Sequence, residues 1–263
     1  MTIVSSIGKR FADSFAAIGD AFALLGEVVV EAVAMIFMPW RFRLGDALLA
    51  FQRAAFDGLP ISIGIGFLLG LILAFQSAAA LRTFGVETYV ADLLAIGLFR
   101  ELGPIITAII LAGRSGSAFA AEIGTMKVDE ELDALTTMGL PPVRFLVMPR
   151  MVAAILAMPL LTICAELSGL VGGAIVLRLM NIPSAVFWGN VADTTDVFMI
   201  VLGLSKSALF GLLVGLVGCC AGMRTKATAD GVGVAATAAV VGGIVAIAVA
   251  DGLIAVICYF WGV

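Results

Sequence analysis

The sequence predicts an all-α integral membrane protein with about five transmembrane helices, and three observations support this prediction. Of the 263 residues, 62% are hydrophobic and 13% are charged, about half the charged share of a soluble domain. The hydrophobic residues gather in runs of roughly 20 residues or more, long enough to cross a hydrocarbon core of about 30 Å. Because an open sheet leaves backbone groups unsatisfied in lipid, a helical bundle is the expected architecture.

The five expected spans cover residues 59–81, 90–121, 151–177, 198–223 and 234–261. The second would be about 48 Å long as one straight helix, so we expect it to bend, tilt or protrude from the bilayer. Its Gly103-Pro104 pair is the expected position of a kink, because proline removes a backbone donor inside the helix.

Residues 1–58 are expected to form an N-terminal cytoplasmic or interfacial region, separate from a permease domain over residues 59–263. Glu27 and Glu31 interrupt its most apolar part and share one helical face. This pattern is typical of one or two amphipathic helices lying in the membrane interface. A further membrane span ending at Pro39 is the alternative.

Basic residues predict the orientation. With the N-terminus inside, ten lie in cytoplasmic segments and two, Arg82 and Arg178, lie in outer loops; the ten are Lys9, Arg10, Arg41, Arg43, Arg53, Lys127, Arg144, Arg150, Arg224 and Lys226. The positive-inside rule then places the N-terminus in the cytoplasm and, after five spans, the C-terminus on the outer side.

Composition argues against several function classes. A net charge of −4 and a pI near 4.8 do not favour a nucleic-acid partner, which basic patches would attract. The sequence has no histidine, and its four cysteines lie in apolar segments without the spacing of a zinc site. We therefore expect neither a metal site nor a catalytic constellation. No phosphate-binding loop G-x-x-x-x-G-K-[ST] occurs.

A short helix is expected at about residues 129–139, between the second and third spans. Asp129 is the expected N-cap, acidic residues follow at the positive end of the dipole, and Gly139 fits the position after the last turn. One face carries Val128, Leu132, Leu135 and Met138, whereas Glu130, Glu131 and Asp133 point elsewhere. From these residues alone, the helix is either a solvated loop helix or a docking element for a cytoplasmic partner.

Five of the ionisable residues inside the expected spans lie at similar depth in the outer half of the membrane, where such groups are costly and are functional candidates. At 1.5 Å per residue, Arg100 and Lys206 lie about 12 Å below the outer surface, and Glu101, Glu166 and Asp251 lie at similar depth. We expect one polar layer, in which Arg100 or Lys206 neutralises one of the three acids. Arg100 and Glu101 are adjacent and are not expected to pair with each other.

Two roles for this layer stay open: holding the helices in register, or acting on a lipid headgroup or as a gate. The second role fits Arg100 and Glu101 best, because they precede the Gly103-Pro104 break. Arg114 and Glu122 lie two turns apart on one face near the cytoplasmic end. We expect them to anchor the helix at the interface or to the 129–139 helix, rather than to bind lipid.

The segment from Phe99 to Ala153 carries the motifs R-E-L-G-P, A-G-R-x-G-S, E-I-G-T-M and E-E-L-D-A-L in this order. It resembles the MlaE (YrbE) permease family, the membrane subunits of ABC transporters that act with MCE-domain lipid carriers. Two departures stand out. Asp129 occupies a position where serine or threonine is commoner, and residues 231–241 replace a threonine-richer pattern.

The resemblance implies a homodimer in the inner (plasma) membrane, two cytoplasmic ABC ATPase subunits, an MCE-domain partner and phospholipid as cargo. It implies that the 129–139 helix is the coupling helix seated in the ATPase, through Asp129, Glu130, Glu131, Leu132, Asp133, Leu135 and Met138. The chain itself would be non-catalytic and hold no cofactor, because ATP and Mg²⁺ bind in the partner. A secondary transporter or channel for an amphipathic or anionic solute is the alternative; such proteins often have repeated halves, and no repeat is evident here.

Overall fold

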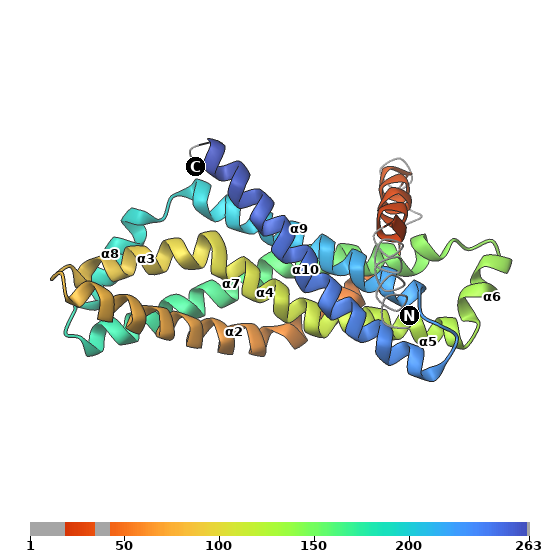
Figure 1. The fold of residues 1–263 in the computed structure, drawn as a ribbon, viewed down its shortest axis with the longest axis horizontal. Helices are drawn as coiled ribbons and strands as arrows, with labels where there is room; N and C mark the ends of the chain where they lie inside the picture. The colour runs from red at the N-terminus through yellow and green to blue at the C-terminus, as the bar shows by residue number, and fades with distance from the viewer. Residues whose placement is uncertain (1–18, 35–42, 262–263) are drawn as a thin grey trace, which may run out of the picture.

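The computed structural model describes residues 19–34 and 43–261, and the regular structure in this part of the chain is entirely helical. Five of its helical stretches are long and apolar enough to span a membrane: Leu44–Arg82, Glu87–Val128, Val143–Leu179, Val197–Met223 and Ala229–Trp261. Helices α2 and α7 run along the long axis of the molecule and α10 crosses it obliquely, with α6 at one end and α8 at the other (Figure 1). The predicted fold class, an all-α membrane protein with about five spans, is confirmed.

The first span is α2 (Leu44–Arg82), which begins 15 residues before the expected start at residue 59. Its 39 residues correspond to about 58 Å, far more than the hydrocarbon core needs. Pro60 lies inside the helix without ending it. The expected boundary between residues 58 and 59 therefore falls within a continuous helix, because the charged residues that ended the apolar run do not break helical geometry.

The second span is built from several helical pieces. In order they are the 3₁₀ turn η2 (Glu87–Tyr89), α3 (Val90–Gly97), the π-helical turn η3 (Leu98–Leu102), α4 (Gly103–Leu111), the π-helical turn η4 (Ala112–Gly116) and α5 (Ser117–Val128). The chain changes direction where α3 passes into α4 (Figure 1). The break expected at Gly103-Pro104 is therefore present.

The remaining elements are α6 (Glu131–Thr137), the π-helical turn η5 (Val143–Val147), α7 (Met148–Leu179), α8 (Ser184–Thr194), α9 (Val197–Met223) and α10 (Ala229–Trp261). Of the five spans, α7 is the most buried and α10 the least. Helix α2 packs against α7 along most of its length. A Cβ atom on Gly70 would overlap the carbonyl oxygen of Gly169, so the two backbones touch through their glycines.

Residues 19–34 form a helix that crosses the long axis of the bundle near its α6 end (Figure 1). Leu24 and Val28 are buried in the hydrophobic core. Two ion pairs fix this helix: Glu31 binds Arg144 through two hydrogen bonds of 2.8 and 3.0 Å, and Asp20 lies 3.2 Å from Arg224. This orientation fits the expected interfacial helix. Pro39, the expected end of the alternative span, lies outside the described residues.

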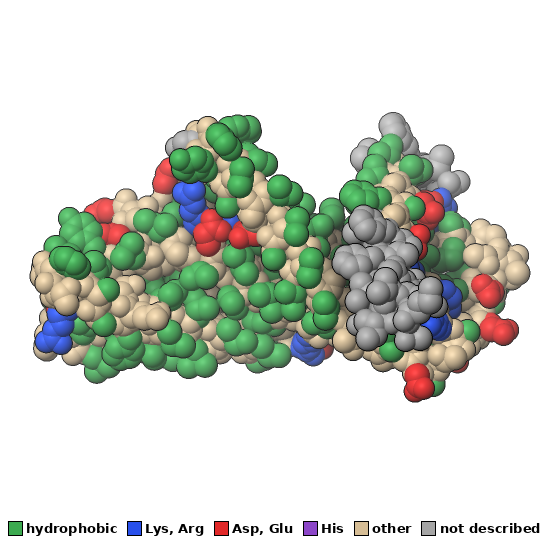
Figure 2. All heavy atoms as spheres, in the orientation of Figure 1, with side chains coloured by type: hydrophobic (Ala, Val, Ile, Leu, Met, Phe, Trp, Pro, Cys, Tyr) green, Lys and Arg blue, Asp and Glu red, His purple; other side chains and the backbone are tan. Residues whose placement is uncertain are grey.

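Hydrophobic side chains cover most of the bundle surface in Figure 2, and a small group of acidic and basic side chains interrupts them beside α10. The exposed side chains of α2, α7 and α10 include Leu68, Ile72, Leu167, Val245 and Val249. A soluble protein rarely exposes so large a continuous apolar surface. The surface is the one that lipid tails would cover.

Candidate functional site

The short helix between the second and third spans is α6, and it lies at the far end of the molecule (Figure 1). Glu130, Glu131 and Asp133 are exposed, whereas Leu132 is buried and Leu135 half-buried. Thus α6 rests on the bundle by its leucines and presents its carboxylates outward. Met138, which was expected on the apolar face, is 64% exposed.

The start of α6 differs from the prediction. Asp129 does not cap it: Asp129 ends α5, and Glu130 occupies the N-cap position in the left-handed conformation, with φ of 60°. The reason is that α5 continues to Val128 without a break, so the reversal into α6 falls on Asp129 and Glu130. Gly139, with φ of 72°, adopts the left-handed conformation expected after the last turn.

The intramembrane charges form a compact ion cluster. Lys206 Nζ lies 2.6 Å from Glu101 Oε2 and 2.7 Å from Asp251 Oδ1, so one ammonium joins η3, α9 and α10. Lys206 is 3% exposed. The expected pairing of Lys206 is confirmed for Glu101 and Asp251. We call Arg100, Glu101, Lys206 and Asp251 the charge layer.

Pro104 accounts for a further contact of the charge layer. Proline has no backbone N–H, so the carbonyl oxygen of Arg100, four residues earlier, lacks its α-helical donor. Lys206 Nζ donates a hydrogen bond of 3.2 Å to this oxygen. The helix break and the charge are therefore parts of one arrangement, because the ammonium binds the carbonyl whose α-helical donor the proline cannot supply.

Arg100 and Glu101, which were not expected to pair, approach to 3.8 Å between Nε and Oε1. The prediction was wrong because it assumed α-helical geometry. The π-helical turn η3 places more residues in each turn and so brings neighbouring side chains closer around the axis. Both side chains are about one-third exposed, although they lie within a membrane span.

Glu166 does not join Lys206. It is 2% exposed, and within the described residues it has no hydrogen bond or ion pair. Instead its carboxyl lies beside Gly103: a Cβ atom there would lie 2.8 Å from Glu166 Oε1. The expected layer thus includes Glu166 as a neighbour of the helix break and not as a partner of the cation.

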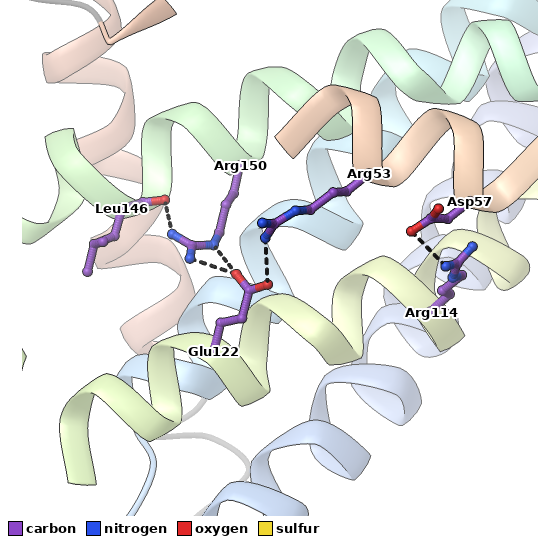
Figure 3. A network of polar contacts seen from close by, with 6 residues as sticks. All are labelled: Arg53, Asp57, Arg114, Glu122, Leu146 and Arg150. Atoms are coloured by element: carbon purple, nitrogen blue, oxygen red, sulfur yellow. Dashed lines mark hydrogen bonds and ion pairs between the residues drawn. The ribbon is translucent and has the colours of Figure 1, made fainter. Parts of the chain in front are cut away.

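Arg114 and Glu122 belong to a second polar network, near the α6 end of the bundle (Figure 3). Arg114 Nη2 lies 2.9 Å from Asp57 Oδ2 on α2. Glu122 accepts two hydrogen bonds from Arg150 on α7, of 2.7 and 3.2 Å, and lies 3.8 Å from Arg53 on α2. The pair therefore ties the second span to α2 and α7, and among the described residues neither side chain has an ion pair with α6.

Sequence reasoning missed Gly203 and the partners of the second network. A Cβ atom on Gly203 would overlap the carbonyl oxygen of Phe99, so this glycine lets α9 reach η3 and bring Lys206 to the break. In the sequence, the one indication of a close helix contact at Gly203 is its position three residues before a lysine in an apolar run. Asp57 and Arg53 were placed outside the first span, although they occupy the same helix.

Five spans, a short acidic helix projecting between the second and third, and a buried cation at a helix break define a multi-pass α-helical membrane protein. The model of the family described as Permease MlaE matches residues 48–257, which include almost all of the five spans. The chain belongs to this family.

Curated relatives agree with this assignment. The chain is 33% identical over 236 residues to a probable ABC transporter permease protein of Rickettsia typhi, covering 89% of each chain. It is 34% identical over 214 residues to another from a Synechocystis species, covering 81% of this chain and 80% of the relative. It is 31% identical over 238 residues to the intermembrane phospholipid transport system permease protein MlaE of Haemophilus influenzae, covering 89% of each chain.

Proposed function

We propose that this chain is the membrane permease subunit of an ABC transporter that moves phospholipids between membranes of the cell envelope. The match to the MlaE permease family over residues 48–257 carries this proposal. The name of the Haemophilus relative supplies the cargo. A secondary transporter or channel is not favoured, because the relatives are named as ABC transporter permeases.

The proposal assigns ATP and Mg²⁺ to a separate ATPase chain, since the sequence has no phosphate-binding loop. It also includes a second copy of this chain and an MCE-domain lipid-binding partner. The N-terminus and α6 lie in the cytoplasm and the C-terminus on the outer side, in accord with the distribution of basic residues.

Helix α6 is the proposed contact with the ATPase. Three features support this role: its carboxylates are exposed, its leucines hold it on the bundle, and left-handed residues at both ends fix its direction. The surface that receives it on the ATPase should be basic, because opposite charges favour specific association.

Reversal of the three exposed acids on and before α6 tests this contact. The variant Glu130→Lys, Glu131→Lys, Asp133→Lys should insert and fold normally but lose the co-purifying ATPase. The matched control is Asp193→Lys, Asp196→Lys, which reverses exposed acids at the opposite end of the bundle. Retention of the ATPase by the triple variant, or equal loss from the control, would refute the proposed contact.

The proposed lipid path or gate is formed by Arg100 and Glu101 of the charge layer and by the adjoining helix break at Gly103 and Pro104. The partial exposure of Arg100 and Glu101 at membrane depth supports this role, because a purely structural pair would be shielded from lipid. The variant Arg100→Gln should lower phospholipid transfer in reconstituted vesicles while the ATPase still co-purifies. Unchanged transfer would leave the layer with a structural role alone.

A further inference from the structure

A pocket of about 400 Å³ opens on the polar network near the α6 end of the bundle. Small-molecule sites fall in the same size range. Four guanidinium groups line it, together with three carboxylates; these are Arg43, Arg53, Arg114 and Arg150, and Asp46, Asp57 and Glu122. The formal charge of the pocket is therefore +1. The rest of the lining is mostly apolar and includes Leu49, Ala54, Phe119 and Leu146.

The four arginines differ in how far their hydrogen-bonding capacity is used. Arg43 Nε lies 3.0 Å from Asp46 Oδ2. Arg150 is 16% exposed and donates to Glu122 and to the carbonyl oxygen of Leu146. Arg53 is 64% exposed, and its closest carboxylate oxygen is 3.8 Å away, beyond hydrogen-bond length. Arg114 is 39% exposed and uses Nη2 to bind Asp57.

A guanidinium carries five N–H donors. Among the described residues, Arg53 and Arg114 thus keep most of their donors for another acceptor. Figure 3 shows the Arg53 side chain reaching from α2 toward Glu122, and the Arg114 side chain reaching from the second span toward Asp57 on α2. Arg150 instead holds Glu122, and through it the position of the α5 backbone.

The pocket lies at the depth of lipid headgroups. Arg53 precedes Leu59, the start of the uncharged run of α2, by six residues, or about 9 Å. Asp57, the partner of Arg114, precedes Leu59 by two residues, or about 3 Å. The polar layer on each side of the hydrocarbon core is about 5–8 Å thick, so Arg114 lies level with it and Arg53 lies at its outer edge. Guanidinium groups therefore face the phosphate level of the leaflet, and the apolar lining continues toward its tails.

We propose that this pocket binds the phosphate-bearing headgroup of a phospholipid from the leaflet at the α6 end of the bundle. Arg53 and Arg114 bind the phosphate oxygens directly, and Arg150 is a positioning residue that acts through Glu122. The carboxylates keep the net charge small, so the site exchanges lipid and does not trap it. The role goes beyond the interfacial anchoring expected for Arg114 and Glu122, and it depends on the membrane location of the chain alone, not on the transport proposal.

Titration of the purified full-length chain with dioctanoyl phosphatidylglycerol, read by native mass spectrometry, tests this site. We expect Arg53→Gln to weaken binding at least threefold and Arg53→Gln, Arg114→Gln to weaken it at least tenfold. The matched control is Arg82→Gln at the opposite end of α2, where Arg82 is 76% exposed and lies 3.7 Å from Glu87. The control should bind as the unchanged protein does.

Two competitors define what the site recognises. Dioctanoylglycerol lacks the phosphate and should not displace the lipid, whereas inorganic phosphate at equal concentration should displace little of it because it has no tails. Displacement by dioctanoylglycerol would refute phosphate recognition, and full displacement by inorganic phosphate would show a free-anion site and refute the lipid.

Folding does not confound the test of the single variant Arg53→Gln. Arg53 makes no hydrogen bond among the described residues, so Arg53→Gln should melt at the same temperature as the unchanged protein without added lipid. Unchanged lipid affinity in Arg53→Gln and in the double variant, or an equal loss in Arg82→Gln, would overturn the proposal. ATPase co-purification is a separate readout, so failure of the transport proposal can be distinguished.

Discussion

Exchange of charges between Lys206 and Asp251 is the sharpest test of the charge layer. The variant Lys206→Glu removes the cation that joins two carboxylates at 2.6 and 2.7 Å and places a third acid beside them. Breaking a buried ion pair by removing one partner costs about 3–5 kcal/mol. The lower end of this range applies here because Glu101 is about one-third exposed.

A loss of about 3 kcal/mol should lower the melting temperature of the detergent-solubilised protein by roughly 6–12 °C. Adding Asp251→Lys restores a cation between two acids and should recover at least half of this loss. The matched control adds Glu166→Lys instead, and it should recover nothing, because Glu166 has no ion pair with Lys206 among the described residues. Rescue by Glu166→Lys together with failure of Asp251→Lys would refute the arrangement of the charge layer.

Three further substitutions test two close glycine contacts and one ion pair. Gly70→Ala should destabilise by about 1–3 kcal/mol in a thermal melt, since its Cβ atom would overlap a facing carbonyl; Gly64→Ala, with open space around it on the same helix, should not destabilise. Gly103→Ala should cost a similar amount by pressing on the buried carboxyl beside it, whereas Gly113→Ala, also unobstructed, should be neutral or slightly stabilising. Glu31→Gln weakens a pair of hydrogen bonds with a half-buried arginine. At the lower end of the range for charged groups the loss is about 1.5 kcal/mol, so amide exchange of residues 19–34 should quicken about tenfold. Equal effects in the control glycines, or unchanged exchange, would contradict these expectations.

The long spans could be predicted because the lipid requires apolar side chains in every segment that crosses it, whatever that segment packs against. Helix ends were less predictable. The first span was expected from residue 59, but α2 starts at Leu44 because a helix can leave the bilayer without ending. Asp129 was expected to cap α6, but it ends α5 instead, because local capping preferences do not show how far the preceding helix continues.

The charge layer was partly predictable, because counting residues along each span places these charged side chains at similar depth in the membrane. Similar depth does not determine which acid pairs with which base. Glu166 and Asp251 lie at similar expected depth, yet Asp251 meets Lys206 and Glu166 does not. The choice depends on rotation of each helix about its axis, which is set by packing and not by hydropathy.

Helix α10 shows how such packing fixes one partner. Its buried residues include Ala235, Ala239, Gly243 and Ile247, each four positions after the last, so α10 touches the bundle along a single narrow stripe. Asp251 is the next position in this series, and it lies 2.7 Å from Lys206. Small side chains such as alanine and glycine allow α10 to shift along its neighbours, so this stripe alone does not fix the register of the helix. The ion pair between Asp251 and Lys206 fixes the register. The same ammonium also binds the Arg100 carbonyl, whose α-helical donor Pro104 cannot supply, so the register of α10 is coupled to the break in the second span.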